Sequence, residues 1–196
     1  MKLYLGIDLA GVEHRESGYC ILDEDNSVST GIIYRDSEIM ELARRNMPKV
    51  IAIDAPLALP KGKTIDSKRC IRECDRKLTE MGIKFFPINF AGMRYLTLRG
   101  IKVRKMLEKE GFTVVETYPG AFYDILKIPR AKKDFNTSRR MLIEKFNLKN
   151  VPKKLSVHEL DAIVCALAAR MYDEGTALKI GDPTEILMIL PDPRHF

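Results

Sequence analysis

Four acidic residues stand where folding could gather them into one site. Two of them, Asp8 and Asp54, lie at the ends of apolar segments that are typical of strands, and Glu116 lies near the end of a third such segment. Asp161 falls within the first two turns of a predicted helix. Carboxylates held close together repel one another, and a divalent cation commonly offsets that repulsion. Because oxygen-only ligands favour Mg²⁺ or Mn²⁺, we predict a metal site formed by these four side chains.

The first two acids are positioned by a predicted strand–helix–strand unit. Residues 2–10 alternate between apolar and other side chains, and residues 50–54 form a continuous apolar run that fits a buried parallel strand. Residues 37–45 suit a connecting helix, and such units are right-handed in nearly all proteins. Parallel neighbours lie about 4.8 Å apart, so Asp8 and Asp54 are expected side by side at the carboxyl edge of the sheet, where ligands usually bind.

The other two acids depend on elements further along the chain. Residues 112–119 have strand composition, and that strand is expected beside residues 50–54. The clearest helix begins at Ser156, and Asp161 lies at the flank of its apolar stripe, where it can face the sheet edge. A single Asp at a strand end is more often a turn or capping residue, and Asp161 is equally consistent with an ordinary first-turn acid. Their convergence favours a metal site.

Two residues beside these acids have alternative interpretations. His158, one turn before Asp161, is placed for proton transfer, but its angle on the helix favours an exposed residue of the capping region. Tyr118, beside Glu116, either stacks on a base or packs under the sheet, and packing is the favoured interpretation.

The remaining pattern is that of one mixed α/β domain spanning residues 1–196. Residues 18–23 and 28–35 are predicted strands joined by a hairpin around Asp25. The other predicted elements are helices over residues 67–80, 93–110 and 136–146, a short helix opening at Pro119, and a turn with a final strand over residues 181–191.

Positive charge is concentrated in one segment. Residues 61–110 hold 14 Lys or Arg against 6 Asp or Glu, a net charge of +8, whereas the whole chain carries +6. A concentrated basic region favours a polyanionic partner such as nucleic acid, and the alternative is a solvated helix surface with internal ion pairs. The predicted phosphate-binding side chains, which share one face of the predicted helix over residues 67–80, are Arg69, Arg72 and Arg76.

Composition argues against several other classes of protein. No apolar run approaches the roughly 18 residues of a membrane span, and the chain starts directly on a strand pattern, so we expect a soluble cytoplasmic protein without a membrane partner. The four cysteines follow no paired CxxC spacing and are predicted to be reduced and buried. A structural zinc site is therefore not expected.

Six motifs together resemble one family. They are, in chain order, GIDLAG (6–11), VIAIDAPL (50–57), CDRKL (74–78), ETYPGA (116–121), HELDAIVCALAA (158–169) and GDPTE (181–185). This series resembles the domain of unknown function 429 family, whose members are predicted nucleases with a ribonuclease H-like fold. It is more distantly similar to Holliday-junction resolvases, which carry four acids on that fold. The family ending GDPTEG is replaced by GDPTEI, which alters the turn chemistry.

The resemblance implies a fold and a set of site residues. The fold is a mixed sheet of strand order 3-2-1-4-5 with flanking helices, in which a basic helical insertion at about residues 57–110 precedes strand 5. The implied acidic active-site residues are Asp8, Asp54, Glu116 and Asp161.

The mechanism expected from such a site is hydrolysis of phosphodiester bonds in DNA or RNA by two metal ions, with Asp8 bridging them. One alternative is a non-catalytic module that binds nucleic acid or protein. A less favoured alternative is a nucleotide-binding phosphotransferase of the sugar-kinase and actin type, because GIDLAG also resembles the phosphate loop of that group. Those proteins use two copies of the fold, and no second D-x-G loop is found here.

Overall fold

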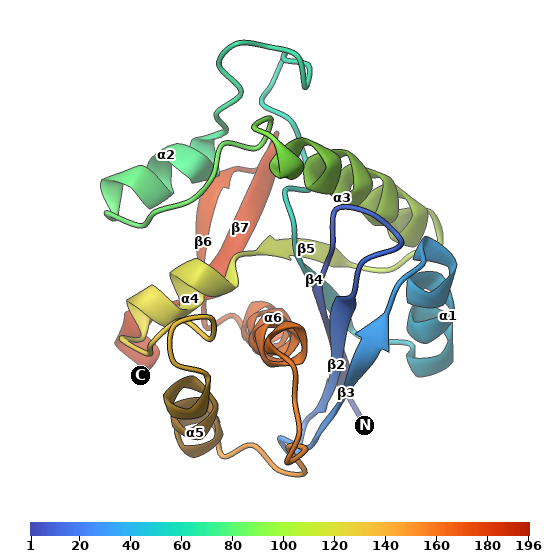
Figure 1. The fold of residues 1–196 in the computed structure, drawn as a ribbon, viewed down its shortest axis with the longest axis vertical. Coiled ribbons are helices and arrows are strands. Elements are labelled where there is room, and N and C mark those ends of the chain that lie inside the picture. The colour runs from blue at the N-terminus through green and yellow to red at the C-terminus, as the bar shows by residue number, and fades with distance from the viewer.

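A seven-stranded mixed sheet runs through the molecule in this computed structural model, which describes residues 1–196 (Figure 1). The strands lie in the order β3-β2-β1-β4-β5-β7-β6. Their bounds are β1 Leu3–Asp8, β2 Ser17–Asp23, β3 Val28–Ile33, β4 Val50–Asp54, β5 Val114–Thr117, β6 Ala177–Asp182 and β7 Ile186–Pro191. Strands β1, β4, β5 and β7 are parallel neighbours, while β2, β3 and β6 run antiparallel to the strands they pair with. The predicted order 3-2-1-4-5 is confirmed.

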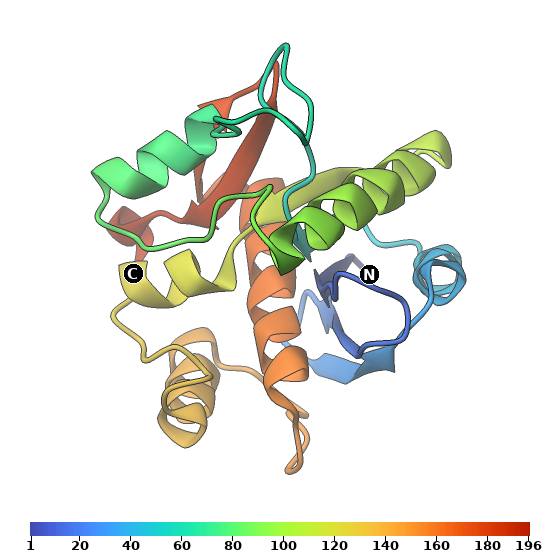
Figure 2. The same ribbon diagram turned by 45° about the horizontal axis from the view of Figure 1, so that its top comes forward.

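Helices cover both faces of this sheet (Figures 1 and 2). On one face α6 packs along β1, β2 and β4, with α4 and α5 beside it, and on the other face lie α1, α2 and α3. Their bounds are α1 Asp36–Asn46, α2 Glu73–Glu80, α3 Gly92–Lys109, α4 Pro119–Ile125, α5 Phe135–Phe146 and α6 Val157–Glu174, followed by a short 3-10 turn at Pro193–His195. None of these helices combines the length and apolar character that crossing a membrane requires.

Strand alternation divides the core into two clusters. Side chains of Tyr4 and Ala52 belong to the cluster on the α6 face, whereas those of Leu5 and Ile53 belong to the cluster on the α1–α3 face. Because successive side chains on a strand point to opposite faces, the position of a residue along its strand decides which layer it enters. The same rule governs the polar residues at the strand ends.

Two elements differ from the sequence-based expectations. The helix predicted from Ser67 begins at Glu73, because Arg72 is extended and its N–H donates to the Asp75 side chain, which caps the helix there. The chain end forms a hairpin of two strands where one strand was predicted. Its turn is closed by the Thr184 N–H, which donates to the Asp182 side chain at 2.8 Å.

Helix α6 approaches the sheet so closely that two strand positions have room only for glycine. A Cβ atom on Gly6 would collide with the backbone of Ala162 and Ala166, and one on Gly18 would collide with the backbone of His158. Any side chain at these strand positions would therefore push α6 away from β1 and β2. The absence of a side chain at Gly6 and Gly18 sets the height of α6 above the sheet.

We predict that Gly6→Ala lowers the free energy of unfolding by about 3 kcal/mol or more, since the added methyl meets backbone atoms that cannot turn aside. Chemical denaturation measures this change. Gly92→Ala is the control: nothing lies within 4 Å of a Cβ there, so its effect should stay within about 0.5 kcal/mol. If the two substitutions changed the free energy of unfolding equally, the close approach of α6 to β1 would be contradicted.

Candidate functional site

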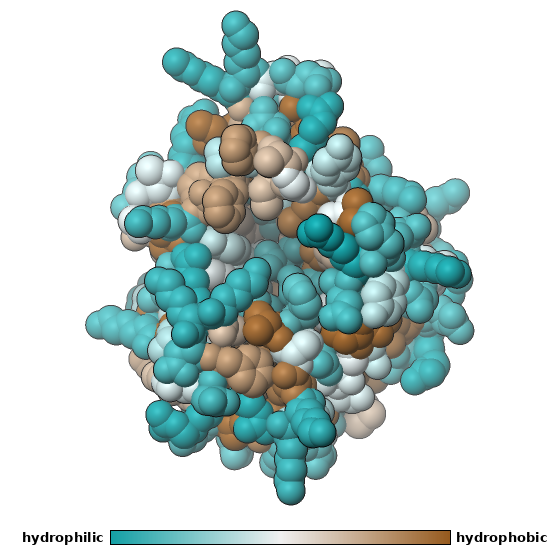
Figure 3. Space-filling view, viewed as in Figure 1, coloured by the Kyte–Doolittle hydropathy of each residue, from teal (hydrophilic) through white to brown (hydrophobic).

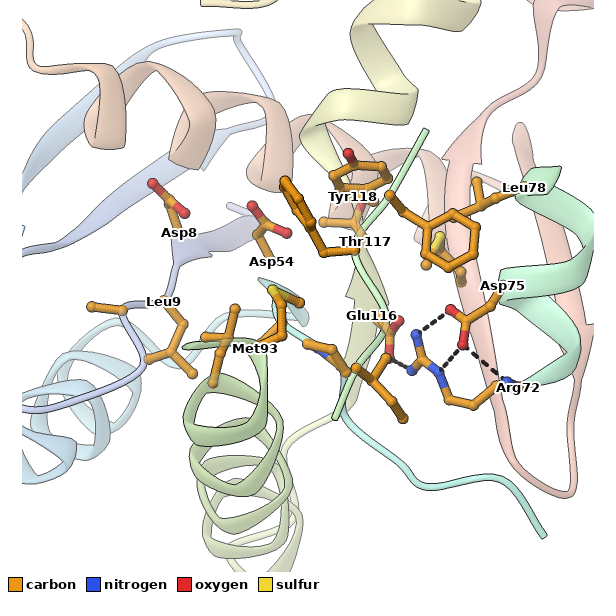
Figure 4. A pocket seen from close by; sticks show the side chains of 18 of the residues that line it. Asp8, Leu9, Asp54, Arg72, Asp75, Leu78, Met93, Glu116, Thr117 and Tyr118 are labelled. Carbon is orange, nitrogen blue, oxygen red and sulfur yellow. Dashed lines mark hydrogen bonds and ion pairs between the residues drawn. The ribbon is translucent and has the colours of Figure 1, made fainter. Parts of the chain in front are cut away.

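Strand register brings two of the predicted site residues together. Asp8 and Asp54 are paired in register on the parallel strands β1 and β4, and Thr117 of β5 continues the same row. All three therefore lie on the sheet face that α6 covers. Figure 4 shows the Asp8 and Asp54 carboxylates side by side, as the sequence predicts from adjacent parallel strands.

Asp161 reaches the same place from α6. Its side chain is buried, and the Tyr123 hydroxyl donates a hydrogen bond to Asp161 Oδ1 at 2.9 Å. Burial, followed by the negative charge of Asp8, raises the pKa of Asp161 to about 7. Burial, followed by the charges of Asp8 and Asp161, also raises the pKa of Asp54 well above its usual value. The three carboxylates thus repel one another, and the positive charge near them does not offset that repulsion.

His158 also belongs to this cluster, so the expectation of an exposed capping-region histidine is wrong. Its Nδ1 lies 2.7 Å from Asp8 Oδ2, and this hydrogen bond raises the pKa of His158. The physical reason is the close approach of α6, whose backbone at His158 lies directly over Gly18. At that distance even a residue off the apolar stripe reaches the end of β1.

Glu116 lies on the other face of the sheet. It is in register with Ile53, one residue before the row that holds Asp54, so its side chain points away from α6. Glu116 Oε2 accepts hydrogen bonds from Arg72 Nη1 at 2.6 Å and from the Leu57 N–H at 2.8 Å. Figure 4 shows this carboxylate turned toward Arg72. The structure therefore brings three of the four predicted acids together and directs the fourth to an arginine.

The buried ion pairs around Glu116 form a network. Arg72 is 2% exposed and donates through its Nε and Nη2 atoms to the two carboxylate oxygens of Asp75, at 3.1 and 2.8 Å. One buried cation thus faces two buried carboxylates, from α2 and from β5. The network ties the insertion between β4 and β5 to the sheet.

The three arginines predicted to bind phosphate have separate environments. Arg69 is exposed and forms no ion pair, Arg72 is committed to the buried network, and Arg76 is exposed and pairs with Glu73 at 3.2 Å. They do not share one helix face, because the helix begins only at Glu73.

One cavity of about 270 Å³ connects the carboxylate cluster to the Arg72 network. Asp8 and Asp54 lie at one end, and Arg72 and Glu116 at the other (Figure 4). His158 lies at the first end, because it is hydrogen-bonded to Asp8. The wall between the two ends is largely apolar and includes Phe85, Phe86, Ile88, Met93 and Leu96. In the space-filling view, hydrophobic side chains gather beside a hollow on this face of the molecule (Figure 3).

Three exposed cations border this cavity or the hollows that adjoin it. Lys132 lines the cavity itself, while Lys84 and Arg15 line neighbouring hollows, and none of the three forms an ion pair within the chain. Sequence reasoning missed them because they come from three separate segments. No local cluster marks them in the sequence.

The carboxylate oxygens of Asp8, Asp54 and Asp161 are suitable ligands for a divalent cation, but they are not arranged in a coordination shell. As the side chains stand, no three His, Cys, Asp or Glu residues are arranged to hold a metal ion. Asp8 Oδ1, Asp161 Oδ2 and both carboxylate oxygens of Asp54 nevertheless have no hydrogen-bond partner in the chain and are not sealed from solvent. Such free carboxylate oxygens are the ligands that Mg²⁺ and Mn²⁺ prefer.

A family model described as "Protein of unknown function (DUF429)" matches residues 6–186, most of the chain. The chain belongs to the DUF429 family. A search of curated proteins finds no match.

Solved structures that align with this chain include two of RuvC from Thermus thermophilus. A structure described as "T. thermophilus RuvC in complex with Holliday junction substrate" aligns with a TM-score of 0.50 and 15% identity, over 92% of this chain and 99% of that chain. A second Thermus thermophilus RuvC structure gives a TM-score of 0.48 and 14% identity, over 91% and 98% of the two chains. The first similarity confirms the ribonuclease H-like fold of this DUF429 protein.

We predict that Arg72→Met lowers the free energy of unfolding by about 3–5 kcal/mol, because it leaves the buried carboxylates of Asp75 and Glu116 without a cation. Denaturant titration in metal-free buffer measures the change. Asp54→Asn is the matched control and should leave stability unchanged or raise it, since it removes a carboxylate from an uncompensated cluster. The opposite ranking would contradict the assignment of Arg72 as the cation of this ion-pair network.

A pH dependence follows from the raised pKa of Asp161. Between about pH 4 and pH 7, the unfolded chain loses the Asp161 proton while the folded protein keeps it, so the folded state loses stability as the pH rises. Each pKa unit corresponds to about 1.4 kcal/mol. In metal-free buffer, Asp161→Asn should therefore gain a few kcal/mol relative to the unsubstituted protein between pH 4 and pH 7. Parallel stability curves for the two proteins would contradict this.

Proposed function

We propose that this protein is a metal-dependent nuclease that hydrolyses phosphodiester bonds in nucleic acid. The observation that carries the proposal is the meeting of Asp8, Asp54 and Asp161 at the carboxyl edge of the sheet, with carboxylate oxygens free for further ligands. Strand ends at this edge are where α/β sheets commonly bind substrates. The apolar cavity beside the acids supplies a partly enclosed place for the substrate.

Each residue of the cluster has a distinct part in the proposed reaction. Asp8, Asp54 and Asp161 would hold Mg²⁺ or Mn²⁺, and His158 orients Asp8 through the contact to Asp8 Oδ2. Tyr123 fixes Asp161 by its hydroxyl hydrogen bond. The bound cation would supply an activated water and stabilise the leaving oxygen. Glu116 supports the site from the opposite face through Arg72 and is not proposed as a ligand.

The partner proposed for this site is nucleic acid. The unpaired cations Arg15, Lys84 and Lys132 surround the cavity from three segments and are suited to phosphate groups. The solved RuvC structure of similar fold is described as bound to a Holliday junction substrate, which supports a nucleic-acid partner here. The exposed Arg69 remains a predicted phosphate contact.

A non-catalytic nucleic-acid-binding module is the second candidate function. One observation favours it: no three acids are arranged to hold a metal ion, and Asp8 and Asp161 already have partners in the chain. On this hypothesis Asp8 and Asp161 serve to hold His158 and Tyr123 in position. The two candidate functions differ in whether the protein cleaves nucleic acid when a divalent cation is present.

A cleavage assay separates the two candidates. The purified protein is incubated with labelled single-stranded, duplex, hybrid and branched DNA and RNA, with Mg²⁺, with Mn²⁺ or with a chelator. We expect metal-dependent cleavage of at least one substrate, and a loss of at least about 100-fold in rate for Asp8→Asn, since that change removes one charge from the proposed ligand set.

The matched control for Asp8→Asn is Asp173→Asn, which changes an aspartate that pairs with Lys2 outside the site. Its cleavage rate should stay within about threefold of the unsubstituted protein. Cleavage that survives Asp8→Asn would exclude the proposed site, and binding of the substrates without any cleavage would favour the binding module.

A further inference from the structure

We propose that the cavity beside the acids binds a single unpaired nucleobase of the nucleic acid, which leaves its stack to enter. This inference rests on the proposed nucleic-acid partner, and it names the feature that the substrate must present. The cavity volume of about 270 Å³ lies just below the range of typical small-ligand pockets, about 300–1,000 Å³. It has room for one flat ring system and none for a paired duplex.

The walls of the cavity suit an aromatic ring. Phe85, Phe86 and Tyr118 line it with aromatic side chains, and Met93 and Leu96 line it from α3. Bases stack on such side chains regardless of sequence, because every base presents a flat face. The expected recognition is therefore by stacking rather than by a pattern of hydrogen bonds.

The charged residues at the Arg72 end of the cavity disfavour a phosphate there. Arg72 is the cation there, and its guanidinium is already paired with Asp75 and Glu116. A phosphate at that depth would meet carboxylates without a free positive partner. An uncharged base meets no such barrier, so the base enters while its phosphates stay outside, near the exposed cations Lys84, Lys132 and Arg15.

Phe86 lies where three hollows meet. It is 69% exposed, although it is a large apolar side chain, and it borders the cavity and both neighbouring hollows. One of those hollows includes Lys84 and the other includes Arg15. A strand crossing Phe86 can thus place one base in the cavity and set its flanking phosphates near these two cations.

The consequence is a preference for nucleic acid with an unpaired base. Extrusion of a base from an intact duplex costs a few kcal/mol, and a single-stranded, bulged or branched position avoids most of that cost. Such substrates should bind better than a fully paired duplex of the same length. This preference comes from the unpaired base, because all of these substrates offer the same sugar–phosphate backbone to the protein.

Fluorescence anisotropy with two labelled duplexes tests the inference. One duplex carries a single bulged nucleotide, and the other carries an abasic residue at the same bulge, so the two differ only by the base. In metal-free buffer, where cleavage does not interfere, we expect the bulged base to bind about tenfold more tightly, as stacking of one base is worth about 1–3 kcal/mol. Equal affinity for the two duplexes, or no binding of either, would overturn the proposal.

Substitutions of Phe86 test whether the preference for the bulged base arises in this cavity. Phe86→Ala should abolish the preference for the base, and Phe86→Tyr should retain it, because the tyrosine ring still stacks. Phe196→Ala is the control, since Phe196 is another partly exposed aromatic residue, which packs against Phe146 and outside the cavity. A preference that survives Phe86→Ala would overturn the assignment.

This test is independent of cleavage. If the preference for the base is found and no substrate is cut, the base site stands and the nuclease proposal fails. If substrates are cut and the base makes no difference to binding, the base site fails and the nuclease proposal stands.

Discussion

The contact between α6 and the first two strands, made across Gly6 and Gly18, determines the geometry of the whole site. Because no side chain separates the helix from the sheet, the first turns of α6 lie directly over the ends of β1 and β2. Asp161 is thereby buried beside Asp8 and Asp54, and His158 reaches Asp8. A helix held further away by side chains at those two positions would leave only the pair of strand-end aspartates.

The sheet separates the acids into two groups with opposite electrostatic character. On the α6 face, burial and the charges of neighbouring carboxylates raise the pKa values of Asp54 and Asp161, and no lysine or arginine forms an ion pair with the three aspartates. On the other face, Asp75 and Glu116 are held by the buried guanidinium of Arg72. One group is therefore suited to an added cation, whereas the other already has a cation of its own and anchors the segment between β4 and β5.

Much of this arrangement could be predicted from the sequence. The alternation in β1 and the apolar run of β4 place Asp8 and Asp54 together through the geometry of parallel strands alone, and the family motifs correctly imply the strand order. The side of the sheet that Glu116 faces depends on the register between β4 and β5, which no local pattern reveals. Likewise, the role of His158 depends on how closely α6 approaches Gly18, and the burial of Arg72 depends on partners 3 and 44 residues away.

Asp8, Asp54 and Asp161 are proposed to form a cation site in which Glu116 takes no part. A crystal structure of the protein soaked with Mn²⁺, with anomalous scattering used to locate the metal, tests this most directly. We expect an anomalous peak on the α6 face, within coordination distance of Asp8 and Asp54, with the Arg72–Glu116 ion pair intact. A peak coordinated by Glu116, or no peak among the three aspartates at saturating Mn²⁺, would contradict it.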